Sequence, residues 1–252
     1  LDPDADRCSV ATVGPDGQWR QLTGDEIGAL LGEQAARDAT RPGDTLACSI
    51  VSSRLLGRIA ADHGLRFAAT LTGFKWIART SGLRLGYEEA IGYCTDPDTV
   101  RDKDGIGAMV RVISLVEELG RDGRTLTDEL DRLARRHGLH ATAPLTIRVE
   151  DTALIGEMMQ RLRSSPIERL AGSPVVENRD LAHGSADLPP TDGVLVRTAA
   201  DDRVVVRPSG TEPKLKCYLE VVLDCSDGAV PRDEAARRLD ALGADISAVL
   251  EV

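Results

Sequence analysis

Lysine is scarce in this sequence. Of its 252 residues only Lys75, Lys103, Lys214 and Lys216 are lysines, and arginine supplies the other side-chain cations. The formal net charge is −10, without the basic excess or basic stripe that nucleic-acid-binding and membrane-surface proteins usually carry. We therefore expect neither nucleic acid nor a membrane as a partner. An acidic protein that binds an anion must gather its cations locally, so short basic clusters are the places to search.

Paired cysteines and long apolar runs are also missing. The five cysteines are odd in number and show no Cys-x-x-Cys spacing, which argues against a disulfide framework or a zinc site. No apolar run approaches the roughly 18 residues of a membrane span, and no signal peptide is recognisable. These absences predict a cytoplasmic location. The first residue is Leu1 rather than Met, which favours a piece of a longer chain.

Strand and helix patterns alternate in the first half of the chain. Apolar segments at 45–51, 66–71 and 83–87 predict strands, and a helical pattern at 54–63 separates the first two. This β-α-β order predicts an α/β domain whose sheet contains parallel strands covered by helices.

A long amphipathic helix is predicted over 104–119. Its aliphatic residues Ile106, Val110, Ile113 and Val116 recur at helical spacing, and we expect them to lie in the core rather than to form a cofactor site. A second helix, over 127–137, is closed by Gly138.

The pattern changes near residues 141–146. Strand, helix and strand follow, then a polar stretch and two β runs at 194–198 and 203–206, and the chain ends in a helix over 233–249. We therefore divide the chain into a leading segment, 1–21, an α/β domain, 22–143, and a smaller α+β domain, 144–252.

The strongest single motif is Arg207-Pro208-Ser209-Gly210-Thr211-Glu212-Pro213-Lys214. An arginine ends a predicted strand, and two hydroxyl residues and a lysine follow within a tight turn. Gly210 would let backbone N–H groups turn toward one point, and Arg207 can offer a bidentate fork to phosphate oxygens. An ordinary turn between two strands is the alternative. The convergence of donors favours a grip for a phosphate monoester.

An acidic run opens the chain. Asp2, Asp4 and Asp6 alternate with other residues, and three carboxylates this close repel one another unless a cation neutralises them. Ligands that are all oxygen favour Mg²⁺ over zinc. A solvated acidic terminus is the alternative on residue types alone.

These motifs together resemble a known family. The 207–214 string is similar to the phosphate loop in the last domain of the α-D-phosphohexomutases, the phosphoglucomutases and phosphomannomutases. Four further strings resemble that family in its own order: Asp2-Pro3-Asp4-Ala5-Asp6-Arg7, Thr72-Gly73-Phe74-Lys75-Trp76-Ile77, Gly86-Tyr87-Glu88-Glu89-Ala90-Ile91-Gly92-Tyr93 and Arg101-Asp102-Lys103-Asp104-Gly105-Ile106. Several motifs in one order are far more specific than any one of them.

The resemblance implies a fold and a division of domains. Residues 1–21 would be the tail of the second mutase domain with its metal loop. Residues 22–143 would be the third domain, a doubly wound α/β domain with a mixed sheet and the sugar-recognition loop. Residues 144–252 would be the C-terminal α+β domain, with an antiparallel sheet and the phosphate loop.

The resemblance also assigns roles to residues. It implies Arg7 and Lys103 as catalytic residues and the three aspartates, Asp2, Asp4 and Asp6, as ligands of Mg²⁺. The substrate-binding residues that it implies, with Lys103 again among them, are Gly73, Lys75, Glu88, Lys103, Arg207, Ser209, Gly210, Thr211 and Lys214. Glu88 can accept hydrogen bonds from two adjacent sugar hydroxyls. Where the family commonly has Ser or Thr two residues later, this chain has Ala90, which puts mannose specificity in doubt.

The activity implied is an intramolecular phosphotransfer, an isomerase reaction. Such a mutase interconverts hexose 1-phosphate and hexose 6-phosphate, with glucose or mannose as the sugar, through a phosphoserine and a bisphosphate. The parent enzyme would use a sugar 1,6-bisphosphate as activator, and Mg²⁺ would be weakly bound or absent in this chain alone. No T-x-x-x-S-H-N-P-like string occurs here, so we expect the 252 residues to be inactive without their missing N-terminal domains.

Three other interpretations remain. The chain could belong to a phosphopentomutase of the same family, or be an isolated sugar-phosphate binding module without catalysis. A phosphatase-like hydrolase with an Asp nucleophile in a D-x-D motif, formed by Asp2 and Asp4, is the third. That hydrolase would leave the 207–214 loop unexplained.

Overall fold

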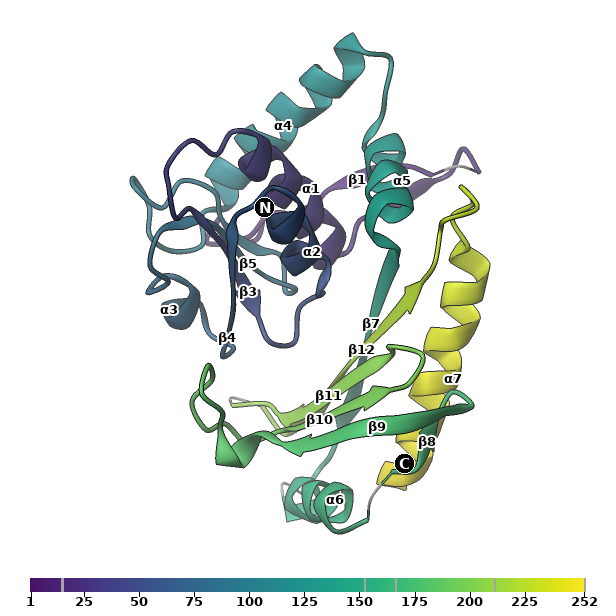
Figure 1. Ribbon diagram of the computed structural model, residues 1–252. Helices are drawn as coiled ribbons and strands as arrows, with labels where there is room; N and C mark the ends of the chain where they lie inside the picture. Colours follow the sequence, from purple (N-terminus) through teal and green to yellow (C-terminus); the bar gives the residue numbers. More distant parts are fainter. Residues whose placement is uncertain (15, 152, 166, 211, 252) are drawn as a thin grey trace. The chain divides into compact units, whose positions relative to one another are not determined.

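The computed structural model of the chain describes residues 1–14, 16–151, 153–165, 167–210 and 212–251. The chain divides into two compact units, Leu1–His137 and Gly138–Val252 (Figure 1). The division expected from sequence, between residues 143 and 144, falls inside a strand that runs from Leu139 to Arg148. Because a strand belongs wholly to its sheet, the structural division lies after His137.

The first unit is built on a mixed sheet with the strand order β4-β3-β5-β6. Its central strand β3 pairs in parallel with β4 and β5, whereas β5 and β6 are antiparallel. The strands are β3 (Thr45–Ser49), β4 (Arg66–Thr70), β5 (Leu83–Glu88) and β6 (Gly92–Cys94). The mixed-sheet α/β fold expected from the sequence is confirmed.

Helices cover both faces of this sheet. Alternate residues of β3 point to opposite faces, so Leu46 and Cys48 join the core under α1, α2, α4 and α5, whereas Ala47 packs with Phe74 and Ile77 of α3. The helices are α1 (Gly24–Arg37), α2 (Leu55–Asp62), α3 (Phe74–Ile77), α4 (Gly105–Arg121) and α5 (Leu126–His137).

A capping box starts α1. The Thr23 hydroxyl accepts from the Glu26 backbone N–H at 3.1 Å, and the Glu26 carboxylate accepts from the Thr23 N–H at 2.8 Å. Two backbone donors that the helix leaves unpaired are thereby satisfied. The helix therefore begins at Gly24.

The exposed face of α4 contradicts one prediction. Ile106, Val110, Ile113 and Val116 were expected in the core, and they are 53%, 57%, 59% and 47% exposed. The buried face instead consists of Ala108, Val112, Leu115 and Leu119. Both sets recur at helical spacing because α4 is apolar almost all round, so periodicity alone could not choose between them.

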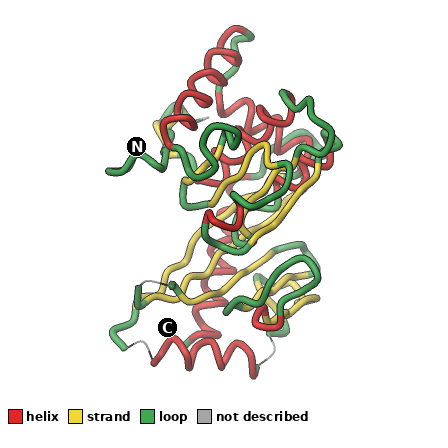
Figure 2. The backbone as a smooth tube through the Cα atoms, turned by 90° about the vertical axis from the view of Figure 1, so that its left-hand side faces the viewer, coloured by secondary structure: helices red, strands yellow, loops and turns green. Residues whose placement is uncertain are grey.

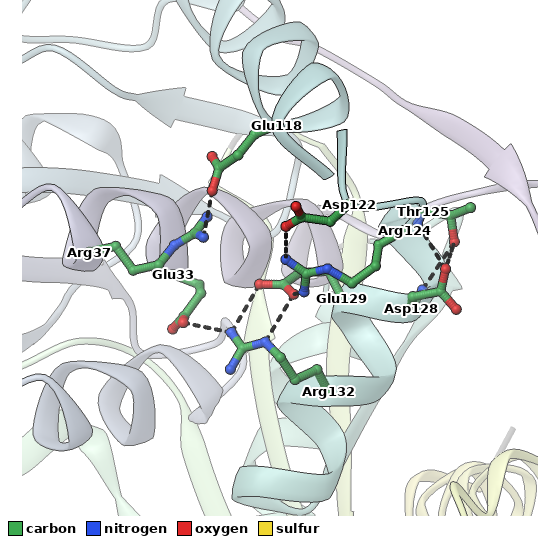
Figure 3. Close-up of polar contacts among 9 residues, drawn as sticks. All are labelled: Glu33, Arg37, Glu118, Asp122, Arg124, Thr125, Asp128, Glu129 and Arg132. Carbon is green, nitrogen blue, oxygen red and sulfur yellow. Dashed lines mark hydrogen bonds and ion pairs between the residues drawn. The ribbon is translucent and has the colours of Figure 1, made fainter. Parts of the chain in front are cut away.

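A buried ion network fastens α5 to α1 (Figure 3). The Arg132 guanidinium donates to Glu129 on its own helix at 2.9 Å and to Glu33 of α1 at 2.6 Å. Arg124 donates to the same Glu129 carboxylate at 3.0 Å. The two glutamate side chains are 5% and 1% exposed, for Glu33 and Glu129 respectively. The paired guanidinium groups therefore compensate two carboxylates that are buried from water.

The leading residues belong to the first unit. A two-stranded antiparallel hairpin, β1 (Ala11–Val13) and β2 (Trp19–Gln21), precedes α1. The Thr127 hydroxyl of α5 donates to the Val13 carbonyl at 2.9 Å. The loop before the hairpin is joined to the sheet by a bridge between Arg7 and Gly92.

The second unit is an antiparallel sheet with the order β7-β12-β11-β10-β9-β8 (Figures 1 and 2). Its strands are β7 (Leu139–Arg148), β8 (Arg169–Leu170), β9 (Ser173–Asp180), β10 (Val194–Thr198), β11 (Arg203–Pro208) and β12 (Lys214–Leu223). The antiparallel sheet predicted for the C-terminal domain is confirmed. A single 3₁₀ turn, Leu181–His183, follows β9.

Two helices pack on one face of this second sheet. They are α6 (Ala153–Ser164) and α7 (Arg232–Leu250). Alternate strand residues such as Val204, Val206 and Leu215 form a core with Met159 of α6 and Leu242 of α7. The residues between them, including Arg207 and Lys214, therefore lie on the opposite face.

Among the described residues, no helix combines the length and the apolar character needed to cross a membrane. All five cysteines are buried thiols.

Candidate functional site

The three N-terminal aspartates converge. Carboxylate oxygens of Asp2, Asp4 and Asp6 all lie within 4.8 Å of one another. Ala5 between them has a left-handed φ of 59°, and its N–H donates to the Asp2 carbonyl at 3.1 Å. A non-glycine residue seldom adopts this conformation, and here it turns the chain so that the three side chains meet.

Two cations lie against this acidic loop. The Arg7 side chain donates to Asp2 at 2.6 Å, and the Lys103 ammonium pairs with Asp6 at 3.0 Å. Desolvation acts to raise the pKa of Asp2, but hydrogen bonds from Arg7 outweigh it and leave that pKa lowered. Partial burial acts to lower the pKa of Lys103, but the Asp6 carboxylate outweighs it and leaves the pKa raised. Both groups are therefore held in their charged forms.

Backbone contacts fix the acidic loop beside the loop that follows β5. Cys8 N–H donates to the Ile91 carbonyl at 3.1 Å, next to the bridge between Arg7 and Gly92. At Gly105, the first residue of α4, an added Cβ would lie 2.6 Å from the carbonyl oxygens of Ala5 and Arg7. Only glycine allows this approach, so the start of α4 supports the acidic loop directly.

Glu88 links two of the predicted substrate loops. Its carboxylate accepts from the Gly73 backbone N–H at 2.7 Å, just before α3. Lys75 lies on α3 with its ammonium 5.8 Å from the centre of the Trp76 ring, and Lys103 lies at the same distance from the Phe74 ring. The first unit therefore brings Asp2, Asp4, Asp6, Arg7 and Lys103 together, and it joins Glu88 to Gly73.

The predicted phosphate loop lies in the second unit, between β11 and β12. The Ser209 N–H donates to the Lys214 carbonyl at 2.9 Å, which closes the loop at its base. The Lys214 ammonium, on a side chain 13% exposed, pairs with Glu212 at 2.7 Å. A hydrogen bond from Lys214 lowers the pKa of Glu212. The Glu212 carboxylate of the same loop therefore already neutralises one of its cations, the Lys214 ammonium.

Gly210 and Thr211 are the next two residues of the predicted phosphate loop. Gly210 does not have a positive φ, and a Cβ added there would meet no atom within 4 Å. The conformational reason that the sequence suggested for glycine is therefore wrong. Thr211 lies outside the described residues.

The sheet register adds cations that the sequence analysis did not include in the site. Lys214 lies directly opposite Arg148 of β7, and Lys216 lies directly opposite Arg207 of β11. All four point away from the face that carries α6 and α7. Like charges directly opposite one another in a sheet are unfavourable, so an anion bound across them would relieve the repulsion. We call Arg148, Lys214, Lys216 and Arg207 the cationic strip.

The sequence holds a signal for one of the two missing members of the strip and none for the other. Lys216 is one of the four lysines and lies two residues beyond the loop motif. Arg148 is distant in sequence, and only its pairing with β12 places it there.

These features define a class of protein. One unit carries an acidic, oxygen-rich loop beside a lysine and a glutamate, and the other carries a cationic turn. Groups of these kinds, on an α/β fold, are chemically suited to a divalent cation and to a phosphorylated, hydroxylated small molecule.

Comparison with known proteins gives the family. The model for phosphoglucomutase/phosphomannomutase α/β/α domain III matches residues 23–137, and the model for the C-terminal domain matches residues 145–236. The chain belongs to the phosphoglucomutase/phosphomannomutase family, within the α-D-phosphohexomutase superfamily, and carries its C-terminal portion.

Individual relatives agree with this placement. The chain is 42% identical over 219 residues to a probable phosphomannomutase of Haemophilus influenzae, covering 87% of this chain and 44% of that protein. It is 32% identical over 252 residues to a human phosphopentomutase, covering 87% of this chain and 41% of that protein. The chain therefore spans less than half the length of these curated relatives.

A solved structure shares the fold. The open form of pp63/parafusin, a phosphoglucomutase from Paramecium, superposes with a TM-score of 0.72 over 99% of this chain and 44% of that one. The sequence identity is 20%, so this likeness supports the fold alone.

Proposed function

We propose that this chain supplies the metal loop, the sugar-recognition loop and the phosphate grip of a phosphosugar mutase. The enzyme would interconvert hexose 1-phosphate and hexose 6-phosphate through a phosphoserine and a bisphosphate. The observation that carries the proposal is the joining of the acidic loop to the sugar loop, through the bridge from Arg7 to Gly92 and the pairing of Asp6 with Lys103. The phosphoserine would come from a part of the protein outside these 252 residues.

The donor set fits Mg²⁺. Asp2, Asp4 and Asp6 would hold the ion, because they offer three carboxylates whose oxygens already converge. Bound there, it would neutralise charge on the phosphoryl oxygens. Arg7 orients Asp2, and Lys103 can release Asp6 to meet the substrate because its stem is flexible.

The remaining loops would position the sugar. Glu88 would accept hydrogen bonds from two adjacent sugar hydroxyls, while its contact with the Gly73 N–H keeps the Gly73–Lys75 loop in place. Arg207, Ser209, Gly210, Thr211 and Lys214 would hold the phosphate that is not transferred. Binding energy from that end of the substrate is then available to align the reacting end.

A pentose phosphate is the second candidate substrate. The observation that favours it is Ala90, which replaces the hydroxyl residue that the resemblance leads one to expect near Glu88. Relatives named phosphopentomutase match 87% of this chain.

The phosphate grip can be tested on the 252-residue chain by calorimetric titration with glucose 1-phosphate, mannose 1-phosphate, ribose 1-phosphate and inorganic phosphate. Arg207→Gln should weaken binding of all four by about ten- to a hundredfold, because a charge-assisted bidentate contact is worth about 1.5–3 kcal/mol. Glu88→Gln should change the ranking of the sugars and leave inorganic phosphate unaffected.

The matched control is Arg121→Gln. The Arg121 side chain is 72% exposed and pairs only with Glu117 among the described residues, so its loss should leave all four affinities unchanged. Equal affinities in wild type and Arg207→Gln would refute the phosphate grip. An unchanged sugar ranking in Glu88→Gln would refute the sugar assignment.

A further inference from the structure

Beside Glu88 lies a second glutamate whose carboxyl group points inward. Glu89 Oε2 accepts from the hydroxyls of Ser49 and Ser52, each at 3.1 Å, and these two hydroxyls lie 2.8 Å apart. The Ser52 hydroxyl also accepts from the Glu89 backbone N–H at 3.1 Å. Ser49 ends β3 and Ser52 follows it, and both are 1% exposed. The sugar loop is therefore tied to the carboxyl end of the central strand through a buried carboxyl group.

The opposite side of Glu89 is held by the start of α1. A Cβ added to Gly24 would lie 1.9 Å from the Glu89 carbonyl oxygen, so the helix backbone rests directly on the loop backbone. The next residue, Asp25, is buried and accepts from the Ser53 N–H at 2.7 Å and from the Tyr87 hydroxyl at 2.9 Å. The sugar loop is therefore held between the start of α1 and the segment that follows β3. We call these contacts of Glu89 with Gly24, Ser49 and Ser52 the clamp.

We propose that Glu89 is a positioning residue that holds the sugar loop closed and so aims Glu88, and that ionisation of Glu89 loosens this hold. This inference rests on the proposed function for its link to the substrate, although the positioning itself can be measured without one.

The surroundings of Glu89 oppose a negative charge. Burial, then the charges of Asp25 and Glu88, raise the pKa of Glu89 to about 7. The titratable groups that act on the cluster are Asp25 on α1, Tyr87 and Glu88 on β5, Tyr93 on β6, and Cys8 before the hairpin. When the loop opens, the carboxyl group returns toward its ordinary pKa of 4.5. The clamp is therefore at full strength below about pH 4.5, weakens as the pH rises, and has lost this contribution above about pH 7, where we expect the loop to open.

Amide hydrogen exchange at Gly73 reports the state of the clamp. The Gly73 N–H donates to Glu88, and the clamp on the neighbouring Glu89 sets the position of Glu88. We would compare wild type with Glu89→Gln, which keeps the shape and the hydrogen-bonding groups but cannot ionise. The ratio of their exchange rates at one pH cancels the intrinsic pH dependence. We expect a ratio near one at pH 4, where the carboxyl group is mostly protonated whether the loop is closed or open. At pH 8, where the group is ionised, we expect at least several-fold faster exchange in wild type.

Two further variants complete the design. Gly24→Ala displaces the loop without touching the carboxyl group, and it should speed exchange at both pH values. Glu118→Gln removes a glutamate whose side chain is 44% exposed on α4, and it should behave as wild type.

Affinity for glucose 1-phosphate, measured in parallel, should fall between pH 4 and pH 8 more steeply in wild type than in Glu89→Gln. Equal Gly73 exchange in wild type and Glu89→Gln at pH 8 overturns the inference, whatever the sugar affinity. Faster exchange in wild type without any sugar binding supports the positioning role and refutes the proposed function instead.

Discussion

Most residues of the candidate site could be identified from sequence because they lie in short motifs. The aspartates, Lys103 and Glu88 fall in strings that differ clearly from the rest of an arginine-rich chain. Arg148 could not be found in this way, because only the register between β7 and β12 brings it opposite Lys214. The inward orientation of Glu89 was equally hidden, since the two glutamates are adjacent and chemically identical.

At Lys216 and Arg148 we predict opposite effects on binding and on stability. Lys216→Gln and Arg148→Gln should each weaken binding of inorganic phosphate several-fold. Each should also raise the free energy of unfolding by a few tenths of a kcal/mol, because like charges directly opposite in a sheet are destabilising by about that amount. Titration calorimetry and urea unfolding in phosphate-free buffer measure the two effects.

Arg169→Gln is the control, because Arg169 is an exposed arginine of the short strand β8, at the other edge of the same sheet. It should leave the phosphate affinity unchanged. An unchanged phosphate affinity in both Lys216→Gln and Arg148→Gln would show that the cationic strip does not bind phosphate.

Strands were predicted well where short apolar segments mark them. The segments at 45–51, 66–71 and 83–87 correspond to β3, β4 and β5. The buried face of α4 was predicted wrongly because two aliphatic stripes satisfy the same period. The choice between them depends on which side the rest of the unit occupies, and periodicity contains no such information.

The network that joins α5 to α1 predicts a large effect from one substitution. Arg132→Met should lower the free energy of unfolding by about 2–4 kcal/mol, because it leaves the buried Glu33 and Glu129 carboxylates poorly compensated. Desolvation acts to raise the pKa of Glu129, but the hydrogen bond from Arg132 outweighs it and leaves that pKa lowered, so the effect should shrink as the pH falls below the usual carboxyl range. Urea unfolding at pH 7 and pH 4 measures it.

The contrasting substitution is Arg121→Met on α4. Its exposed ion pair with Glu117 should contribute less than about 0.5 kcal/mol. A loss for Arg132→Met as small as this would show that the network is solvated and weak.

The whole molecule divides into two compact units, and the change of pattern near residue 144 indicated this from sequence alone. The exact division was missed because a strand crosses the expected point. Both tryptophans, Trp19 and Trp76, belong to the first unit. Tryptophan fluorescence therefore reports unfolding of that unit, whereas far-UV circular dichroism reports both.

We predict that inorganic phosphate separates the two signals. At about 100 times its dissociation constant, a ligand stabilises the unit that binds it by about 2.7 kcal/mol. The part of the circular dichroism transition that belongs to the second unit should move to higher urea, while the tryptophan transition stays in place. Equal shifts of both signals would mean that the units unfold as one cooperative block.

The scarcity of lysine has a chemical consequence. The chain has four side-chain amines, and each lies in or next to a predicted binding loop. Lys103 and Lys214 are ion-paired, whereas Lys75 lies exposed on α3. A reagent that acylates amines would therefore act on this protein almost as an affinity label, with Lys75 modified first. Enzymatic acetylation would have the same bias, because the arginines that cover the remaining surface do not react.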